Sequence, residues 1–213
     1  MNKKKALLIG DYTHPKFHPL QGVDAEITHT LQDYLSVQCS ENNHMFEYNN
    51  LGAFDLCISY LDSWTEKLSL KQTGGLLSFV SGGGGLLILH NGIIMDNRYE
   101  LAQLIGAKHT AHRSRQTLEL RVTGPGHDVT RGIEGFKIED EPYRFEFDPF
   151  TEKTVLLEYT TTDGEWHPAA WAHSYGLGRV VYLMPGNDQP AFQHPVYQKL
   201  LLQAAKWAAR VSG

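Results

Sequence analysis

One histidine, His90, follows a predicted strand at a position where a sharp turn would direct its side chain into a pocket. His90 follows the apolar run of residues 86–89 and precedes Asn91 and Gly92. A strand that turns sharply into a helix pushes one side chain into a pocket, as at a nucleophile elbow. An imidazole in that place can serve as acid, base or ligand near neutral pH. We therefore expect the working site around His90. A histidine that caps the next helix or bonds a neighbouring loop is the alternative.

Two carboxylates are adjacent at Asp140 and Glu141, just before a proline and a tyrosine. A carboxylate beside an imidazole is the usual equipment for moving protons or holding a divalent metal. We therefore assign Glu141 to catalysis together with His90. A solvated acidic loop is the alternative interpretation of this segment.

Further candidates follow from a rule of open α/β sheets, whose ligands bind beyond the carboxyl ends of the strands. His112 is expected to orient a substrate from a loop. The residues assigned to substrate binding are His14, Asp62, Asn91, Tyr143, Trp171 and Asn187. Flat apolar rings suit sugars, so Tyr143 and Trp171 are expected to wall the pocket, with core packing as the alternative.

No local signature names a cofactor or a nucleophile. His14 and His18 share a loop whose prolines discourage a helix, and the chain has no H-E-x-x-H. A zinc or other divalent site assembled from distant parts of the chain stays open, and the cofactor is otherwise unassigned. Serine catalysis lacks its G-x-S-x-G motif, and neither Cys39 nor Cys57 follows a strand at an elbow.

Strands and helices alternate in the first half of the chain, which is typical of a doubly wound parallel sheet. Strands are predicted over residues 5–9, 37–40, 54–60 and 86–89, and helices over residues 22–37, 66–81 and 98–105. The four glycines 82–85 precede a strand, whereas phosphate loops follow one and open a helix. A helix stop and a sharp turn are therefore expected there.

The second half changes to short strands and ends in a helix. The strands are predicted over residues 117–123, 155–160, 169–173 and 179–184, and the helix over residues 195–209. The apolar positions of this helix nearly surround it, which predicts that it is well buried. No linker, low-complexity segment or repeat interrupts the chain, so residues 1–213 are expected to form a single domain.

Composition excludes several classes of partner. The net charge is −5 with acids and bases interleaved, and no basic stripe indicates nucleic acid. No apolar stretch approaches the roughly 18 residues of a membrane span. The basic start and short apolar run at residues 3–9 fit a buried strand better than a signal peptide, so we expect a cytoplasmic protein. A homo-oligomer stays open.

Several segments together resemble the ThuA-like family, which is named from trehalose utilisation and related in fold to class I glutamine amidotransferases. The segments that carry the resemblance are residues 87–92, 104–107, 112, 127–133, 140–143, 171, 175–180 and 206–207. The resemblance implies an α/β, flavodoxin-like or class I glutamine amidotransferase-like three-layer sandwich with a mostly parallel central sheet. In the amidotransferases the elbow carries a cysteine. Here His90 occupies it, so glutamine hydrolysis is not expected.

The resemblance points to trehalose or related disaccharide and keto-sugar metabolism. The leading hypothesis is a sugar-modifying enzyme, an isomerase or hydrolase, in which His90 and Glu141 exchange protons with the substrate. The alternatives are a non-catalytic sugar-binding or regulatory module and a metal-dependent hydrolase. Two departures matter: the family pattern has Gly-His where this chain has Gly186-Asn187, and His-Pro where it has His127-Asp128. Any mechanism that needs a histidine at position 187 is therefore in doubt.

Overall fold

The computed structural model describes residues 3–13, 17–61, 63–64, 66–162 and 164–211. Its main sheet has nine strands in the order β2-β1-β3-β4-β11-β10-β9-β6-β7, and β5 and β8 form a small separate sheet. The strands are β1 (Lys4–Gly10), β2 (Leu35–Ser40), β3 (Leu56–Tyr60), β4 (Gly85–Leu89), β5 (Ala107–His112), β6 (Gln116–Val122), β7 (Phe136–Asp140), β8 (Tyr143–Phe147), β9 (Thr154–Thr160), β10 (His167–Tyr175) and β11 (Gly178–Leu183).

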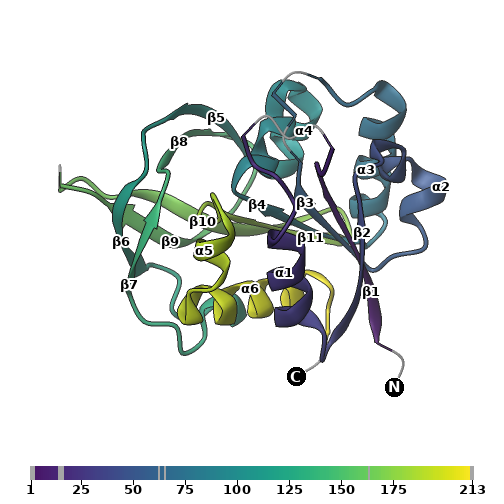
Figure 1. Cartoon of the computed structure of the whole chain (residues 1–213). Coiled ribbons are helices and arrows are strands. Elements are labelled where there is room, and N and C mark those ends of the chain that lie inside the picture. The colour runs from purple at the N-terminus through teal and green to yellow at the C-terminus, as the bar shows by residue number, and fades with distance from the viewer. Residues whose placement is uncertain (1–2, 14–16, 62, 65, 163, 212–213) are drawn as a thin grey trace.

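Helices are grouped on the two faces of this sheet. Figure 1 shows α1, α5 and α6 together on one face and α2, α3 and α4 on the other. The α-helices are α1 (Val23–Leu31), α2 (Tyr48–Leu51), α3 (Leu70–Ser81), α4 (Tyr99–Ile105), α5 (Gln189–Phe192) and α6 (Pro195–Ala208). Three short 3-10 segments complete the described structure: η1 (Asn43–Phe46), η2 (His90–Asn97) and η3 (Asp128–Thr130). None of the helices in the described ranges combines the length and apolar character needed to cross a membrane.

The half of the sheet built from β2, β1, β3, β4 and β11 is parallel. Strands β3 and β4 are buried along their whole length, as continuous apolar runs covered on both faces should be. The chain leaves β1 in one direction to form β2 and leaves β3 in the other direction to form β4. Because these strands are parallel, the loops after β1, β3, β4 and β11 lie at one edge of the sheet. Ligands of such folds bind at this edge, at the point where the strand order reverses.

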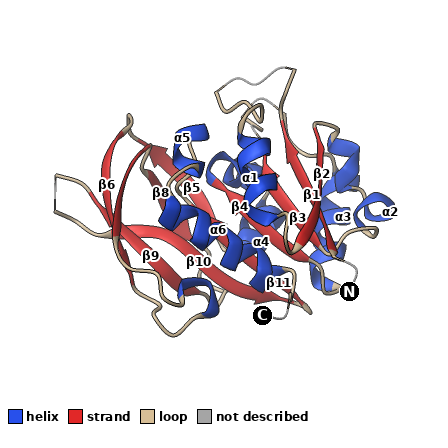
Figure 2. Cartoon of the chain, turned by 60° about the horizontal axis from the view of Figure 1, so that its bottom comes forward, coloured by secondary structure: helices blue, strands red, loops and turns tan. Residues whose placement is uncertain are grey.

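The other half of the sheet is antiparallel, which corrects the expectation of a mostly parallel sheet. Strands β11, β10, β9, β6 and β7 pair as antiparallel neighbours, and Figure 2 shows β6 and β9 at the opposite end of the sheet from α2 and α3. Alternating burial along β6 and β7 fits strands with one solvated face. The fold is therefore α/β with a large mixed sheet.

Local signals account for most element boundaries. The predicted helix over residues 22–37 ends early, at Leu31, because Leu35 begins the edge strand β2. Helix α3 begins at Leu70, where Ser69 and Gln72 form a capping box. The glycines after it end the helix and start β4, as predicted. No clear local pattern predicts β5 and β8, which pair with each other outside the main sheet.

Candidate functional site

His90 lies at the carboxyl end of β4 with a backbone φ of 42° and no exposed surface. A positive φ is strained for a residue other than glycine, and such strain concentrates at functional sites. A side chain at Gly92 would overlap the carbonyl oxygen of Ser59, so glycine is required where the segment after β4 passes close to β3. The strand runs into the 3-10 segment η2 before α4 begins, so the turn is an elbow followed by an irregular segment.

The imidazole of His90 is held neutral with one defined tautomer. Its Nδ1 donates a hydrogen bond of 2.6 Å to the carbonyl oxygen of Met184 at the end of β11. Burial, assisted by the neighbouring His18, lowers the pKa of His90 well below its ordinary value. The other nitrogen, Nε2, therefore carries the lone pair. It is buried and has no hydrogen-bond partner among the described residues.

Asp140, at the end of β7, is buried and holds the backbone around His90 in place through hydrogen bonds. Its carboxylate accepts 2.8 Å hydrogen bonds from the backbone N–H groups of Glu141 and Gly186, which ties β7 to the loop after β11. Burial raises the pKa of Asp140 to about 7. Its oxygen lies 3.7 Å from Nδ1 of His90, beyond hydrogen-bond distance, and the proton of Nδ1 already goes to Met184. We therefore regard Asp140 as a positioning residue and not as an ionic partner of His90.

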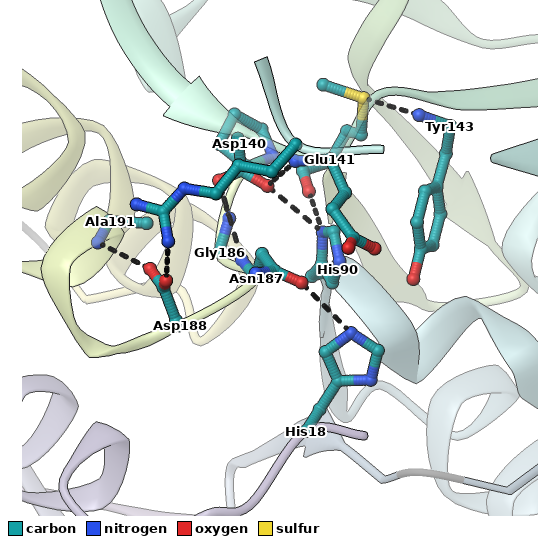
Figure 3. Close-up of polar contacts among 12 residues, drawn as sticks. His18, His90, Asp140, Glu141, Tyr143, Gly186, Asn187, Asp188 and Ala191 are labelled. Atoms are coloured by element: carbon teal, nitrogen blue, oxygen red, sulfur yellow. Dashed lines mark hydrogen bonds and ion pairs between the residues drawn. The ribbon is translucent and has the colours of Figure 1, made fainter. Parts of the chain in front are cut away.

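Three side chains from distant loops converge in front of His90. One ligand atom each from His18, His90 and Glu141 lies within 4.8 Å of the other two. Figure 3 shows the carboxylate of Glu141 and the ring of His18 approaching His90 from different sides. His18 is buried, and its Nε2 lies 3.2 Å from the amide oxygen of Asn187. The carboxylate of Glu141 has no hydrogen-bond partner among the described residues.

A cavity of about 510 Å³ opens over this cluster. Its described lining consists of Phe17, His18, Trp64, His112, Glu141, Tyr143 and Asn187. His112 faces Tyr143 directly across the antiparallel pair β5–β8, and the ring of Trp64 is 5.8 Å from that of His112. The cavity therefore combines aromatic walls with imidazole, carboxylate and amide groups, a composition suited to a small polar ring molecule.

The family of the chain follows from a comparison with known families. Residues 11–208 match the family ThuA, described as "Trehalose utilisation", and this range contains every described residue of the cluster and the cavity. The chain belongs to the ThuA family. A comparison with curated proteins gives no match.

Solved structures agree with the ThuA fold. A putative ThuA-like protein from Parabacteroides merdae superposes with a TM-score of 0.82 at 18% identity, over 98% of this chain and 90% of that one. A cytoplasmic protein from Salmonella typhimurium superposes with a TM-score of 0.72 at 14% identity, over 96% and 99%. The β-galactosidase of Rahnella sp. R3 matches with a TM-score of 0.69 at 16% identity, over 99% of this chain and 32% of that one.

The structure of this ThuA chain brings most of the predicted residues together. Glu141, His112, Tyr143 and Asn187 line the cavity, and His90 lies beneath it. His14 and Asp62 lie outside the described residues. We expected His112 on a loop, but it is the last residue of strand β5.

Two predicted substrate-binding residues do not line this cavity. Trp171 is fully buried in β10, donates from its indole N–H to the carbonyl oxygen of Ile105 and packs against Tyr182. Its assignment as a pocket wall is corrected to core packing. Asn91 is also fully buried, and its amide donates to the carbonyl oxygen of Tyr60, so it braces the loop after β3.

Sequence reasoning missed four residues of the site: Phe17, His18, Trp64 and Asp140. His18 and Trp64 follow β1 and β3, so the rule that pointed to His14 and Asp62 could have been extended by a few residues. Asp140 was recognised as half of a carboxylate pair, but the sequence did not show which member faces the cavity.

A larger cavity of about 790 Å³ lies elsewhere, between β10 and the segment after β8, with His173 and Lys153 in its lining. It includes Tyr175, which pairs with Gly178 at the amino end of β11. This is the edge of the sheet opposite to the one where α/β folds bind ligands. We therefore take the smaller cavity, with its converging polar groups, as the candidate site.

Proposed function

We propose that the protein is a sugar-modifying enzyme of trehalose or related disaccharide and keto-sugar metabolism, acting by proton transfer. The observation that supports it is the convergence of Glu141, His18 and neutral His90 at the floor of an aromatic-walled cavity. The family description points to the same substrate class. The proposal includes a cytoplasmic location and a small-molecule sugar as the partner. It also includes a flavodoxin-like, amidotransferase-type arrangement of layers, with a histidine in place of the elbow cysteine.

Proton transfer next to a carbonyl fits this cavity better than ordinary glycoside hydrolysis. Glycosidases use two carboxyl groups that flank the scissile bond. Among the described lining residues, Glu141 supplies a carboxylate, while the adjacent Asp140 is buried and engaged with backbone N–H groups. A single carboxylate can remove a proton from the hydroxyl-bearing carbon beside a ketone and return it to the former carbonyl carbon, while the hydroxyl proton passes to the former carbonyl oxygen. This isomerisation needs no second carboxylate.

The role that we assign to each residue follows from whether its side chain lines the cavity. Glu141 is half-buried and lines the cavity, so we assign it the proton transfer with the sugar. His112 lines the same cavity and would orient sugar hydroxyls, and Tyr143 and Trp64 would stack on the ring. His90 lies beneath the lining, which favours action through its neighbours over direct contact.

Replacement of Glu141 tests this proposal. Glu141→Gln preserves size but removes the proton acceptor, so turnover of a keto derivative of trehalose should fall by about 10²–10⁴-fold with an unchanged melting temperature. Glu146→Gln, on the exposed face of β8, is the matched control and should retain activity. Full activity of the Glu141→Gln variant would overturn the proposal.

A sugar-binding module without catalysis is the competing interpretation. Calorimetry and the fluorescence of Trp64, which lines the cavity, would both report sugar binding. The enzyme proposal expects binding together with product formation. Binding without product after long incubation with trehalose and its keto derivatives would favour the module.

A further inference from the structure

We propose that His18, His90 and Glu141 form a binding site for one divalent transition-metal cation at the floor of the cavity. The inference deepens the proposed function, because a bound cation would polarise a carbonyl or hydroxyl of the sugar. Glu141 would bind the cation through one carboxylate oxygen and keep the other oxygen for proton transfer. It is tested by metal binding itself, so that it can succeed or fail separately from the proposed sugar chemistry.

The separation of the donor atoms suits a single ion. Zinc binds histidine nitrogen and carboxylate oxygen at about 2.0–2.2 Å, so two ligands of a tetrahedral ion stand about 3.4 Å apart. The donor atoms of His18, His90 and Glu141 lie within 4.8 Å of one another without an ion. Small rotations of these side chains would close the remaining gap.

His90 supplies the second, independent observation. Its side chain is fully buried, and its Nε2 has no hydrogen-bond partner among the described residues. A buried polar atom without a partner costs free energy unless something binds it. Metal-ligating histidines usually donate their other N–H to a carbonyl or carboxylate, which fixes the tautomer and orients the ring. The Nδ1 bond to Met184 has this form.

The chemistry of the donor set indicates which cations fit. Two imidazole nitrogens and one carboxylate oxygen are the protein ligands of many catalytic zinc sites and of facial-triad iron sites. Calcium and magnesium prefer oxygen ligands. The remaining coordination positions would face the cavity, where Asn187 Oδ1 lies 3.2 Å from Nε2 of His18. That separation also suits two ligands of one ion.

The charges around Glu141 are compatible with a bound cation. The described lining of the cavity contains neither lysine nor arginine, and its one carboxylate is that of Glu141. Burial of His90 keeps it neutral, the form that can ligate a metal. A divalent ion would therefore neutralise the carboxylate where the described lining residues offer no fixed positive charge.

Titration of the chelator-treated full chain with Zn²⁺ and Co²⁺ tests the site. We expect one ion per chain by calorimetry, and a visible absorption band of Co²⁺ typical of four or five coordination. His18→Gln and Glu141→Gln should each weaken binding at least tenfold, about 1.4 kcal/mol. His109→Gln is the matched control. The ring of His109 contacts that of Tyr143, which lines the cavity, but His109 is not one of the three proposed ligands. This variant should bind the ion as the parent does.

Each outcome separates the metal site from the proposed function. Absence of stoichiometric binding, or a His109→Gln variant that loses as much affinity as His18→Gln, would overturn the metal site. Turnover of sugar by metal-free protein would overturn the cation's role while leaving the sugar enzyme intact. Tight binding lost in both ligand variants, with no sugar turnover under any condition, would support the metal site and count against the proposed function.

Discussion

At the scale of single residues, His90 combines three properties that point to a functional role. Its backbone lies in the left-handed region, its side chain is fully buried, and one nitrogen is fixed by Met184 while the other faces His18 and Glu141. From the sequence, we would expect His90→Ala to abolish turnover with a nearly unchanged melting temperature. The burial of His90 changes the second half of that expectation.

We now expect His90→Ala to reduce the free energy of unfolding by about 2–4 kcal/mol, because it leaves the Met184 carbonyl without its partner and opens a cavity. His90→Asn should lose less stability, since asparagine tolerates a positive φ and retains an N–H donor. Both variants should lose the metal affinity proposed above. Urea unfolding of the three proteins measures the difference. A His90→Ala variant as stable as the parent would contradict this account.

At the scale of elements, helix α3 packs closely against the segment between η1 and α2. Helix α3 contains two adjacent glycines with opposite surroundings. A Cβ at Gly75 would overlap the carbonyl oxygen of Phe46 and lie 2.6 Å from the nitrogen of Tyr48, whereas a Cβ at Gly74 meets nothing within 4 Å. Gly75 therefore allows the close approach of the segment between η1 and α2.

This pair gives a prediction with its own control. Gly74→Ala should raise the free energy of unfolding by about 0.5–1 kcal/mol, because alanine is favoured over glycine inside a helix. Gly75→Ala should lower it by about 1–3 kcal/mol through overpacking. Thermal or urea unfolding of the two variants measures both effects. Equal effects of the two substitutions would show that α3 does not pack against Phe46 as described.

At the scale of the whole molecule, buried titratable groups couple the fold to pH in opposite directions. Burial lowers the pKa of His109 and of His173 to about 4 and lowers that of His90 well below its usual value. Burial raises the pKa of Asp96 to about 6 and that of Asp140 to about 7. The three histidines favour folding at higher pH, and the two carboxyl groups favour it at lower pH.

His173 provides a test away from the candidate site. Between pH 6.5 and pH 4 the unfolded chain binds a proton at His173 that the folded chain does not, so stability falls as the pH is lowered through this window. One proton corresponds to about 1.4 kcal/mol per pH unit. His173→Gln should therefore show a shallower loss of stability from pH 6.5 to pH 4 in urea unfolding. An unchanged slope would contradict a buried neutral His173.

The sequence by itself determined the elements whose cause is local. Continuous apolar runs identified β1, β3 and β4, the glycines after α3 marked its end, and the position of His90 after a buried strand pointed to the candidate site. These features depend on residues within a few positions of one another. The family could be recognised for a related reason, since the order of short motifs is itself a property of the sequence.

Tertiary structure decided what depends on distant contacts. The antiparallel pairing of β5 with β8 placed His112 opposite Tyr143, and the hydrogen bonds of Asp140 to the loop after β11 left Glu141 as the carboxylate of the cavity. Burial assigned Trp171 to the core. His18 joined His90 because the loops after β1 and β4 meet at one edge of the sheet. Such choices follow from which chain segments pack together in three dimensions, and the spacing of residues along the sequence does not encode them.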